Sequence, residues 1–398
     1  MRLGMLADAY KPHISGITNY ISLSKRYLEK AGHEVFVFTF GGEDYQDEEA
    51  NIVRAPGFPL VDTGYYINIR YPASVQRLLY NMDVVHVHHP FISGRLALRY
   101  CRPRNIPIVF TNHTRYDLYA QAYLPILPEE ISETFLRAYL GSFCANCDLV
   151  IAPSKGILEV LRHLGVDTPV EVIPNGVEIA PFCHVEQPIS KRELGFADED
   201  VLLIYAGRLG PEKNLPFLLR AFAGTAKTYE AIKLLMVGDG PERDNLEDRV
   251  QHMGINEKVR FVGMVPYAEM PRYLAAGDAF VTASVTEVHP LSIIEALAAG
   301  LPVLGISSPG VGDIVEEGYN GLLAPEEDLA VFTAKMVRLV TESQLRQRLS
   351  ENARLSAAKY DIEEITQVLL SHYERLRDDA DKRPNNLRFR ARQMIRGR

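Results

Sequence analysis

The sequence is poor in cysteine, with four in 398 residues, at positions 101, 144, 147 and 183. So few cysteines exclude a small domain held together by a disulfide framework, and they favour a reducing compartment. Cys144 and Cys147 form a C-x-x-C pair, but no second pair exists to complete a zinc site. We therefore interpret this pair as two structural residues late in a helix.

Long apolar runs are also absent. The longest ones, such as residues 148–153, are broken by polar residues or proline far short of the roughly 20 residues that span a bilayer. The N-terminal residues hold too short an apolar stretch for the core of a signal peptide, and they predict an opening β-strand instead. We therefore expect a cytoplasmic protein. The composition, with 47% hydrophobic and 24% charged residues, predicts that the chain is soluble and folded.

Two common nucleotide-binding motifs are missing as well. Neither G-x-G-x-x-G nor G-x-x-x-x-G-K-[S/T] occurs in the chain. Their absence removes the main support for a dinucleotide-dependent oxidoreductase and for a P-loop NTPase.

Positive charge is scarce except at the C-terminus. The net charge is −8, yet residues 382–398 hold seven basic and no acidic residues, so the remaining 381 residues carry −15. An acidic body argues against a nucleic-acid partner, whereas the basic tail suits an anionic membrane surface. The tail is either an amphipathic helix or a disordered basic segment.

Short Val/Ile/Leu-rich runs alternate with amphipathic stretches of helix length, which is typical of βαβ units and a parallel sheet. In the first half this pattern predicts strands at 2–7, 34–40, 84–88, 108–112, 149–153 and 170–173, and helices near 16–31, 129–144 and 155–164. The pattern restarts later, with strands at 201–206, 233–237, 259–262, 279–283, 302–304 and 321–323.

The chain is therefore predicted to be an α/β protein with two Rossmann-like domains facing across a cleft. The predicted parts are an N-terminal domain at 1–178, a linker at 179–200, a C-terminal domain at 201–360, a helix at 361–381 that can cross back to the N-terminal domain, and the basic tail at 382–398.

The loops at the carboxyl ends of the strands are the candidate sites in such a fold. The first of these loops leads into a helix near Gly16, where free backbone N–H groups favour an anion such as a diphosphate. The loop after strand 201–206 holds Gly207, Arg208 and Lys213, and its two cations can neutralise a diphosphate leaving group without a metal ion. Each loop alone could equally be an ordinary capped helix start or a solvated charged turn.

The segment from Glu287 to Glu295 is more specific. Glu287 follows a strand, and Glu295 lies about two turns into the helix that begins near Leu291. This arrangement supplies one carboxylate for sugar hydroxyls, a helix start near Ser292 for phosphate and a second carboxylate for a ribose diol. The alternative is a purely structural carboxylate in an apolar helix.

Histidines cluster at positions 86, 88 and 89, and His113 follows the next predicted strand. His86 and His88 face one side of a strand, where a metal pair is geometrically possible. No acidic or cysteine partner lies nearby in the sequence, so we interpret them as buried core histidines. His113 stands at the carboxyl end of a strand and is a candidate site residue.

Two D-x-D sequences, at 198–200 and 379–381, could hold a metal-bound nucleotide, but they fall in the predicted linker and next to the tail. Residues 112–114 spell a glycosylation sequon, which has no meaning without a signal peptide. Neither pattern is interpreted as functional.

Taken together, these residues resemble the family-4 retaining glycosyltransferases of the GT-B fold over nearly the whole chain. The motifs that carry the resemblance are Gly16, Asn112-His113-Thr114, Ile173-Pro174-Asn175-Gly176-Val177, Gly207-Arg208 with Lys213, Gly238-Asp239-Gly240-Pro241, and Glu287 followed eight positions later by Glu295.

The resemblance implies a role for each matching residue. The implied catalytic residues are His113 beside the reacting face of the donor sugar, Arg208 and Lys213 on the diphosphate, and Glu287 on the sugar. The implied donor-binding residues are Gly16, Gly207, Met264 near the base, His289, Leu291, Ser292, and Glu295 on the ribose. Many relatives have a small or aromatic residue and glycine after the first Glu, where this chain has Val-His-Pro at 288–290, so the sugar is left open.

Residues 113–119 and their neighbours look similar to bacterial diacylglycerol glucosyltransferases, which act at the cytoplasmic face of the membrane. The resemblance thus implies transfer of a hexose from a nucleotide-diphosphate donor, with UDP-glucose first, to a hydroxyl of a lipid such as diacylglycerol. It implies no cofactor and no metal ion, donor binding on the C-terminal domain and acceptor binding on the N-terminal one.

Several alternatives stay open at this point. They are a transferase that uses GDP-mannose and acts on phosphatidylinositol or a growing polysaccharide, a non-catalytic nucleotide-sugar-binding protein, and a nucleotide-sugar epimerase.

Overall fold

The structure is a computed structural model that describes residues 1–382 except for 14, 42–44, 60–65 and 119–128. The predicted tail, apart from Lys382, lies outside the described residues. The chain divides into two compact units, Met1–Asn175 with Ile362–Arg398, and Gly176–Asp361.

A parallel sheet forms the centre of the first unit, with seven strands among the described residues in the order β3-β2-β1-β6-β7-β8-β9. The strands are β1 (Arg2–Leu6), β2 (Glu34–Gly41), β3 (Ile52–Pro56), β6 (Val84–Val87), β7 (Ile108–Thr111), β8 (Leu149–Ala152) and β9 (Val170–Val172). Most of the inner strands are fully buried, because helices cover both faces of the sheet. Burial on both faces explains why these strands are continuous apolar runs in the sequence.

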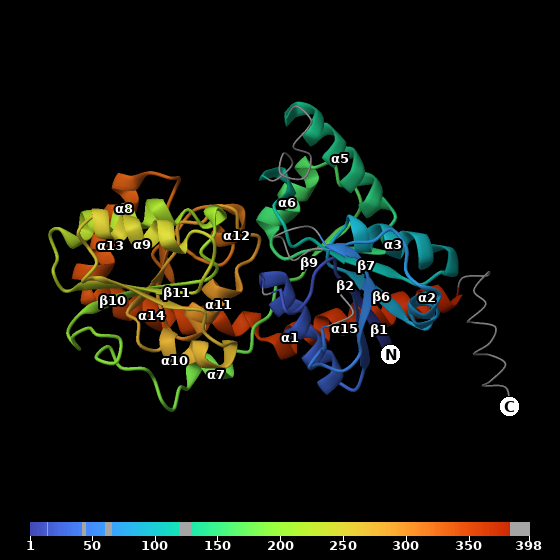
Figure 1. Cartoon of the computed structure of the whole chain (residues 1–398), viewed down its shortest axis with the longest axis horizontal. Coiled ribbons are helices and arrows are strands. Elements are labelled where there is room, and N and C mark those ends of the chain that lie inside the picture. Colours follow the sequence, from blue (N-terminus) through green and yellow to red (C-terminus); the bar gives the residue numbers. More distant parts are fainter. Residues whose placement is uncertain (14, 42–44, 60–65, 119–128, 383–398) are drawn as a thin grey trace. The chain divides into compact units, whose positions relative to one another are not determined.

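Helices α1 (Gly16–Lys30) and α15 (Ile362–Lys382) pack side by side on one face of this sheet (Figure 1). On the other face, Phe143 of α5 (Glu129–Ala145) meets Phe110 of β7 edge to face at 5.1 Å between ring centroids. The other elements are α2 (Ala73–Leu79), α3 (Ile92–Tyr100), η1 (Arg102–Arg104), α6 (Lys155–His163) and the short pair β4 (Phe58–Pro59) and β5 (Tyr66–Ile67).

The last helix, α15, belongs to the first unit although the whole second unit precedes it in the sequence. Its residues Ile365, Leu369, Tyr373 and Leu376 recur at helical spacing and are all buried in the core that α1 shares with the sheet. Burial of this apolar stripe, rather than proximity in the sequence, fixes where the helix lies.

The second unit has its own parallel sheet, in the order β12-β11-β10-β13-β14-β15. The strands are β10 (Val201–Ala206), β11 (Ile232–Val237), β12 (Val259–Gly263), β13 (Ala279–Val281), β14 (Val303–Ile306) and β15 (Gly321–Ala324). From β10 the strands β11 and β12 follow toward one edge of the sheet, whereas β13, β14 and β15 follow toward the other edge, so the strand order reverses between β10 and β13. In doubly wound folds this point, at the carboxyl ends of the strands, is where ligands bind.

Two apolar cores cover the two faces of this sheet. Helices α8 (Leu215–Ala226), α9 (Arg243–His252) and α13 (Leu329–Thr341) lie on one face, and α7 (Ala180–Cys183), α10 (Met270–Leu274) and α11 (Leu291–Ala298) lie on the other (Figure 1). The remaining elements are α12 (Pro309–Gly312), α14 (Ser343–Ala357), η2 (Pro211–Lys213), η3 (Tyr267–Glu269) and η4 (Ala358–Tyr360).

The predicted linker at 179–200 differs from what the structure shows, because these residues are part of the second unit. Phe182, Leu194 and Phe196 are buried in its core. The polar and proline-containing composition of the segment concealed these three apolar anchors. The chain passes between the units at residues 175–176 and 361–362 instead.

Cys144 and Cys147 are free thiols, and burial raises the pKa of Cys144 to about 12. Across the described ranges, every helix is too short or too polar to cross a bilayer.

Candidate functional site

A pocket opens in the second unit near the carboxyl ends of β10 and β13. It encloses about 280 Å³ of space, part of it continuous with solvent. Its walls are formed by Tyr205, Ala206, Gly207, Lys213, Phe280, Thr282, Glu287, Pro290, Ser292 and Ile293. Four residues singled out from the sequence, Gly207, Lys213, Glu287 and Ser292, therefore come together at the point where this fold class binds its ligands.

Lys213 and Glu287 form an ion pair in the pocket wall. The Lys213 Nζ atom lies 2.6 Å from Glu287 Oε1, and the two side chains are 22% and 18% exposed. The loop that carries Lys213 is tied to the loop after β13, because the hydroxyls of Ser284 and Thr286 both donate to the carbonyl oxygen of Glu212, at 3.3 and 3.1 Å. The cation is thus held on a fixed loop rather than on a free turn.

Glycine is required where two loops meet beside the pocket. Gly207 has a φ of +153°, and its N–H donates to the Val237 carbonyl oxygen at 2.9 Å. Gly238 approaches it so closely that a Cβ on Gly238 would lie 1.9 Å from the Gly207 carbonyl oxygen. This contact explains why Gly238 of the family motif admits no side chain.

Arg208 lies on the same loop but is not part of the pocket wall as the structure describes it. Its side chain is 59% exposed, and its guanidinium is 3.6 Å from the Glu212 carboxylate. Its carbonyl oxygen accepts a hydrogen bond from the buried Tyr205 hydroxyl at 2.9 Å. The backbone of Arg208 is thus anchored while its side chain extends into solvent.

The helix α11 presents its N-terminal turn to the pocket. Pro290 precedes the helix and supplies no side-chain cap, while Ser292 and Ile293 line the pocket. The backbone N–H groups of a first turn have no partner within the helix, so they can bind an anion. Leu291, the first residue of the helix, is half-buried beside them.

Glu295 lies deeper in the same helix and is only 6% exposed. The Tyr267 hydroxyl donates to its Oε1 atom at 3.0 Å. Burial raises the pKa of Glu295 to about 7, and the hydrogen bond from Tyr267 opposes part of that rise. Tyr267 belongs to η3, which follows β12 and the exposed Met264.

His289 lies in the core and not in the pocket wall. Its ring packs edge-on against Tyr360, with centroids 5.3 Å apart, and the residue is 5% exposed. Burial lowers the pKa of His289 to about 3, so the side chain is neutral at physiological pH. The ring thus lies outside the pocket wall, and a contact of His289 with the donor stays a prediction.

His113 belongs to the first unit and follows β7. Its Nε2 atom lies 3.1 Å from Nδ1 of the buried His88. His86 is bonded at both ring nitrogens, to the Thr111 hydroxyl at 2.7 Å and to the Tyr373 hydroxyl at 2.6 Å. His86 and His88 are thus buried residues of the core.

Gly16 begins helix α1 and is exposed, and a Cβ built on it would meet no atom within 4 Å. The side chain of the preceding Ser15 accepts a hydrogen bond from the Thr18 N–H at 3.2 Å, which makes it an ordinary helix cap. The packing of the described residues thus does not require glycine at position 16.

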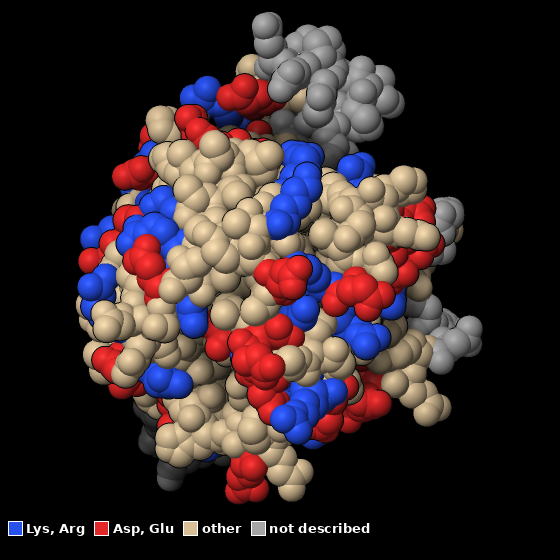
Figure 2. All heavy atoms as spheres, turned by 90° about the vertical axis from the view of Figure 1, so that its left-hand side faces the viewer, with Lys and Arg blue, Asp and Glu red and all other residues tan. Residues whose placement is uncertain are grey.

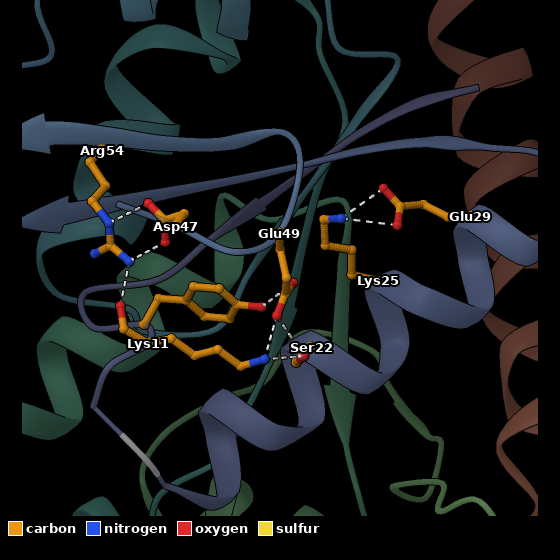
Figure 3. A network of polar contacts seen from close by, with 8 residues as sticks. Lys11, Ser22, Lys25, Glu29, Asp47, Glu49 and Arg54 are labelled. Atoms are coloured by element: carbon orange, nitrogen blue, oxygen red, sulfur yellow. Dashed lines mark hydrogen bonds and ion pairs between the residues drawn. The ribbon is translucent and has the colours of Figure 1, made fainter. Parts of the chain in front are cut away.

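The loop before Gly16 is held by a network of charged side chains (Figure 3). Glu49 accepts hydrogen bonds from Lys11, from the Ser22 hydroxyl at 3.0 Å and from the Tyr10 hydroxyl at 2.9 Å. Arg54 pairs with Asp47 at 2.6 Å and donates to the carbonyl oxygen of Lys11. The contacts of Glu49, and that of Arg54 with Lys11, join residues 27 to 43 positions apart, so no local sequence pattern indicated the network.

The sequence did not predict the places of Tyr205, Phe280 and Thr282 in the pocket wall or of Tyr267 beside Glu295. A signal for the first three was available, because Tyr205 and Phe280 lie near the carboxyl ends of β10 and β13 and Thr282 follows β13 directly. Tyr267 had no such signal, since its contact with Glu295 spans 28 positions.

The metal-binding alternatives find no support in the side-chain arrangement. Within the described ranges, no group of three or more His, Cys, Asp or Glu residues is placed to hold a metal ion. In the D-x-D sequence at 198–200, Asp200 accepts a hydrogen bond from the Ala197 N–H at 2.8 Å, and Asp198 pairs with Arg192 at 2.7 Å. Both carboxylates thus serve local structure.

Comparisons with known proteins match both halves of the chain to glycosyltransferases. The family model for Glycosyltransferase Family 4 matches residues 14–180, and that for Glycosyl transferases group 1 matches residues 186–356. An alpha-monoglucosyldiacylglycerol synthase of Streptococcus pneumoniae is 32% identical, over 83% of this chain and 77% of that protein. A protein of the same name from Acholeplasma laidlawii is 28% identical, over 97% of this chain and all of that protein.

Solved structures agree on the fold. The Anabaena HepE protein in complex with UDP and glucose has a TM-score of 0.76 at 21% identity, covering 94% of this chain and 99% of that one. A sucrose-phosphate synthase from Thermosynechococcus elongatus has a TM-score of 0.77 at 22% identity, covering 94% and 98%. Both family models match, and the Streptococcus pneumoniae relative is 32% identical over 77% of its own length. Because the chain also folds into two Rossmann-like units, it belongs to the family-4 glycosyltransferases of the GT-B fold.

Proposed function

We propose that this glycosyltransferase moves glucose from UDP-glucose to a hydroxyl of a membrane lipid such as diacylglycerol, with retention of configuration at the anomeric carbon. The observation that carries the proposal is the pocket of the second unit, where the Lys213–Glu287 pair, Gly207 and the start of α11 surround one space. The names of the two synthases described above support the glucosyl donor and the lipid acceptor.

In the proposed reaction the bond between the anomeric carbon and the diphosphate oxygen breaks, and its electron pair leaves with the diphosphate. Lys213 and the N–H groups at the start of α11 stabilise the negative charge that develops there. The long exposed side chain of Arg208 contributes a second cation when it turns toward the diphosphate. Glu287 accepts hydrogen bonds from hydroxyls of the sugar, and Glu295 from the ribose.

Retention follows if the acceptor oxygen bonds to the anomeric carbon on the face from which the diphosphate departs. The acceptor proton then passes to the departing phosphate oxygen, so no protein carboxylate forms a covalent intermediate. His113 in the first unit, which is proposed to carry the acceptor, donates a hydrogen bond to the sugar near the reacting carbon.

Protein groups supply all the positive charge in this scheme, so we propose that no divalent ion takes part. Activity measured after exhaustive treatment with EDTA should equal that of the untreated enzyme. Loss of activity that magnesium or manganese restored would overturn this part of the proposal.

The function is tested with a screen of donors against acceptors. UDP-glucose, UDP-galactose and GDP-mannose are each offered with vesicles that contain diacylglycerol, vesicles that contain phosphatidylinositol, or no lipid. We expect turnover with UDP-glucose and diacylglycerol, and an α-linkage in the product by NMR. A β-linked product would exclude retention from an α-linked donor, and conversion of the donor without an acceptor would indicate an epimerase.

A second candidate donor is GDP-mannose. A relative from Corynebacterium glutamicum, named a GDP-mannose-dependent alpha-mannosyltransferase, is 27% identical over 81% of this chain. Faster turnover with GDP-mannose than with UDP-glucose in the same screen would favour this candidate. Binding of a donor with no turnover on any acceptor would leave a nucleotide-sugar-binding protein.

A further inference from the structure

Four aromatic side chains of the first unit form a continuous path of contacts from helix α15 to His113. The Tyr373 hydroxyl bonds to His86, the rings of His86 and His88 lie 4.3 Å apart between centroids, and His88 Nδ1 lies 3.1 Å from His113 Nε2. The ring of Tyr20 packs against His113, with centroids 4.8 Å apart. His88 is thus held on both sides and cannot turn without disturbing its neighbours.

Both partners of the central contact are neutral imidazoles. Burial and the neighbouring histidines lower the pKa of His88 and of His113 well below the ordinary value. A neutral imidazole carries a proton on one ring nitrogen only. In the contact between His88 and His113, one ring must therefore donate and the other must accept.

The second nitrogen of His88 decides the direction. His88 is fully buried, and its Nε2 atom has no hydrogen-bond partner in the described part of the chain. If His113 donated, His88 would carry its proton on Nε2 as a buried N–H without an acceptor, an arrangement that is rare in proteins. If His88 donates from Nδ1, only a lone pair on Nε2 stays unused, which is the less unfavourable choice.

We propose that His88 is a positioning residue that donates its Nδ1–H to His113 Nε2 and so fixes the proton of His113 on Nδ1. Nδ1 of His113 has no partner among the described residues, and His113 is half-buried, so this N–H is available to a ligand. The ligand class is a hydroxyl or another neutral acceptor, because a neutral N–H donates one hydrogen bond without carrying charge.

The consequence for catalysis rests on the proposed function. A histidine in water prefers its proton on Nε2 and then presents a lone pair at Nδ1, where a sugar hydroxyl needs a donor. The hydrogen bond from His88 opposes that preference at His113. His86 acts one step further away: it is bonded at both nitrogens, and its ring packs on His88 and keeps that ring in place. In Ser-His-Asp hydrolases, replacement of the residue that holds the tautomer of the catalytic histidine strongly lowers kcat.

The experiment reads the tautomer directly. The full-length chain is labelled with ¹⁵N-histidine, and the His113 signals are assigned from the spectrum of a His113→Asn variant. In the natural protein without substrate, we expect the ¹⁵N shift of a protonated Nδ1 and an unprotonated Nε2 at His113. A proton found on Nε2 of His113 would overturn the proposal, and this measurement needs no other variant to fold.

Two variants separate donation from packing. His88→Leu fills similar space without a donor, so Nε2 of His113 loses its hydrogen bond, and we expect the ¹⁵N signal of Nε2 to move toward the shift of an unbonded lone pair. His88→Asn places an amide N–H close to the position of Nδ1, and we expect it to restore the original shift. An unchanged Nε2 shift in a folded His88→Leu protein, with the His86 signals undisturbed, would also overturn the proposal.

The rate of sugar transfer provides a second, separate test. We expect His88→Leu to lower kcat for sugar transfer by about 10-fold with little change in KM for the donor, and His88→Asn to recover most of that loss. The NMR result is obtained without substrate, so it holds or fails separately from the proposed function. A changed Nε2 signal in His88→Leu without any change in kcat would refute the catalytic consequence and leave the proton assignment intact.

Discussion

Lys213 is the residue on which the proposed chemistry depends most. It lies in the pocket wall on a loop that is fixed by two hydroxyl contacts, and its charge is paired with Glu287. The sequence predicted a cation at this strand end from the rule that ligands bind there. It did not predict the direct pair with Glu287, because the two residues are 74 positions apart and belong to different loops.

We expect Lys213→Ala to lower kcat by roughly 100-fold or more, since a fixed donor to developing charge contributes about 2 to 4 kcal/mol to the barrier. The measurement is steady-state kinetics with the donor and acceptor found in the screen. The control is Lys335→Ala, which removes the Lys335 pair with Glu317 elsewhere in the same unit. Near-normal turnover in the Lys213 variant would contradict the site.

Glu295 lies on the helix whose first turn lines the pocket, and its burial lowers the stability of the fold. Its pKa is raised by burial from 4.5 to about 7, so the folded protein holds this proton to a higher pH than the unfolded chain does. The free energy of unfolding therefore falls as pH rises from 4.5 to about 7, and the full cost is present above that range. A buried carboxylate that the fold does not need suits a role in binding hydroxyl groups.

We expect Glu295→Gln to raise the free energy of unfolding at pH 8 by up to about 3 kcal/mol and to leave it nearly unchanged at pH 4.5. Glutamine keeps an acceptor for Tyr267 and stays neutral, but it loses the charge that strengthens bonds to a ribose. Urea denaturation at both pH values and calorimetric titration with UDP measure the two effects. Equal stabilisation at both pH values would show that the charge is not the cause.

Gly16 offers a test in which folding is not expected to interfere. Among the described residues, a methyl group at this position meets no atom within 4 Å beyond its chain neighbours and its own helix, so Gly16→Ala should leave the melting temperature nearly unchanged. If the donor diphosphate lies at this helix start, as the resemblance implies, KM for the donor should rise by roughly 10-fold. Gly224→Ala, inside α8, is the matched control and should leave KM as it is. An unchanged KM in the Gly16 variant would remove this residue from the donor site.

At the scale of elements, predicted strands match observed ones closely where the sequence holds a continuous apolar run. Strand β10 is an example, because its residues 202–206 are all buried. Strand β3 was missed, since Arg54 and Pro56 interrupt its pattern. Arg54 reaches the loop before α1, so the same polar residue that concealed the strand performs a structural task that only the folded chain makes visible.

The network around the first loop predicts that Arg54 acts on both stability and donor binding. Its side chain is 12% exposed and that of its partner Asp47 is 16% exposed, so Arg54→Ala leaves a carboxylate poorly solvated and frees the Lys11 carbonyl. We expect a loss of about 1 to 3 kcal/mol in unfolding free energy and a raised KM for the donor. Chemical denaturation and steady-state kinetics measure the two effects.

A surface pair gives the scale for comparison. Arg338 and Glu342 form a pair in which both side chains are nearly half exposed, and Arg338→Ala should cost less than 1 kcal/mol. A double-mutant cycle with Asp47→Asn isolates the contribution of the Arg54 pair. Equal effects of Arg54→Ala and Arg338→Ala would mean that the network does not hold the loop.

For the whole molecule, the site residues predicted from the sequence divide between the two units. His113 and Gly16 belong to the first unit, and the other predicted site residues belong to the second. Residue types at strand ends could be predicted because the topology of a parallel sheet places them there. Burial of His289 and exposure of the Arg208 side chain could not, since they depend on packing between elements distant in the sequence.

Charge is distributed differently in the body and at the C-terminus. On the face drawn in Figure 2, acidic and basic side chains are mixed over the surface. Residues 1–381 carry a net charge of −15, so we expect an anionic membrane to repel them at long range, and we propose that the seven basic residues at 382–398 provide the opposing attraction. Each basic residue near such a surface contributes about 1 kcal/mol.

Deletion of residues 382–398 should therefore abolish binding to anionic vesicles and lower turnover on lipid acceptors presented in them. Co-sedimentation with phosphatidylglycerol vesicles at about 0.1 and 1 M salt measures binding, and we expect the intact chain to bind only at the lower salt. A variant with all seven basic residues changed to glutamine keeps the length and should behave like the deletion. A variant with a scrambled tail sequence keeps the charge but loses any amphipathic pattern. Full vesicle binding by this variant would show that charge alone causes the binding, whereas weak binding would show that an amphipathic helix is needed. Undiminished binding without the tail would mean that a surface of the folded units meets the membrane instead.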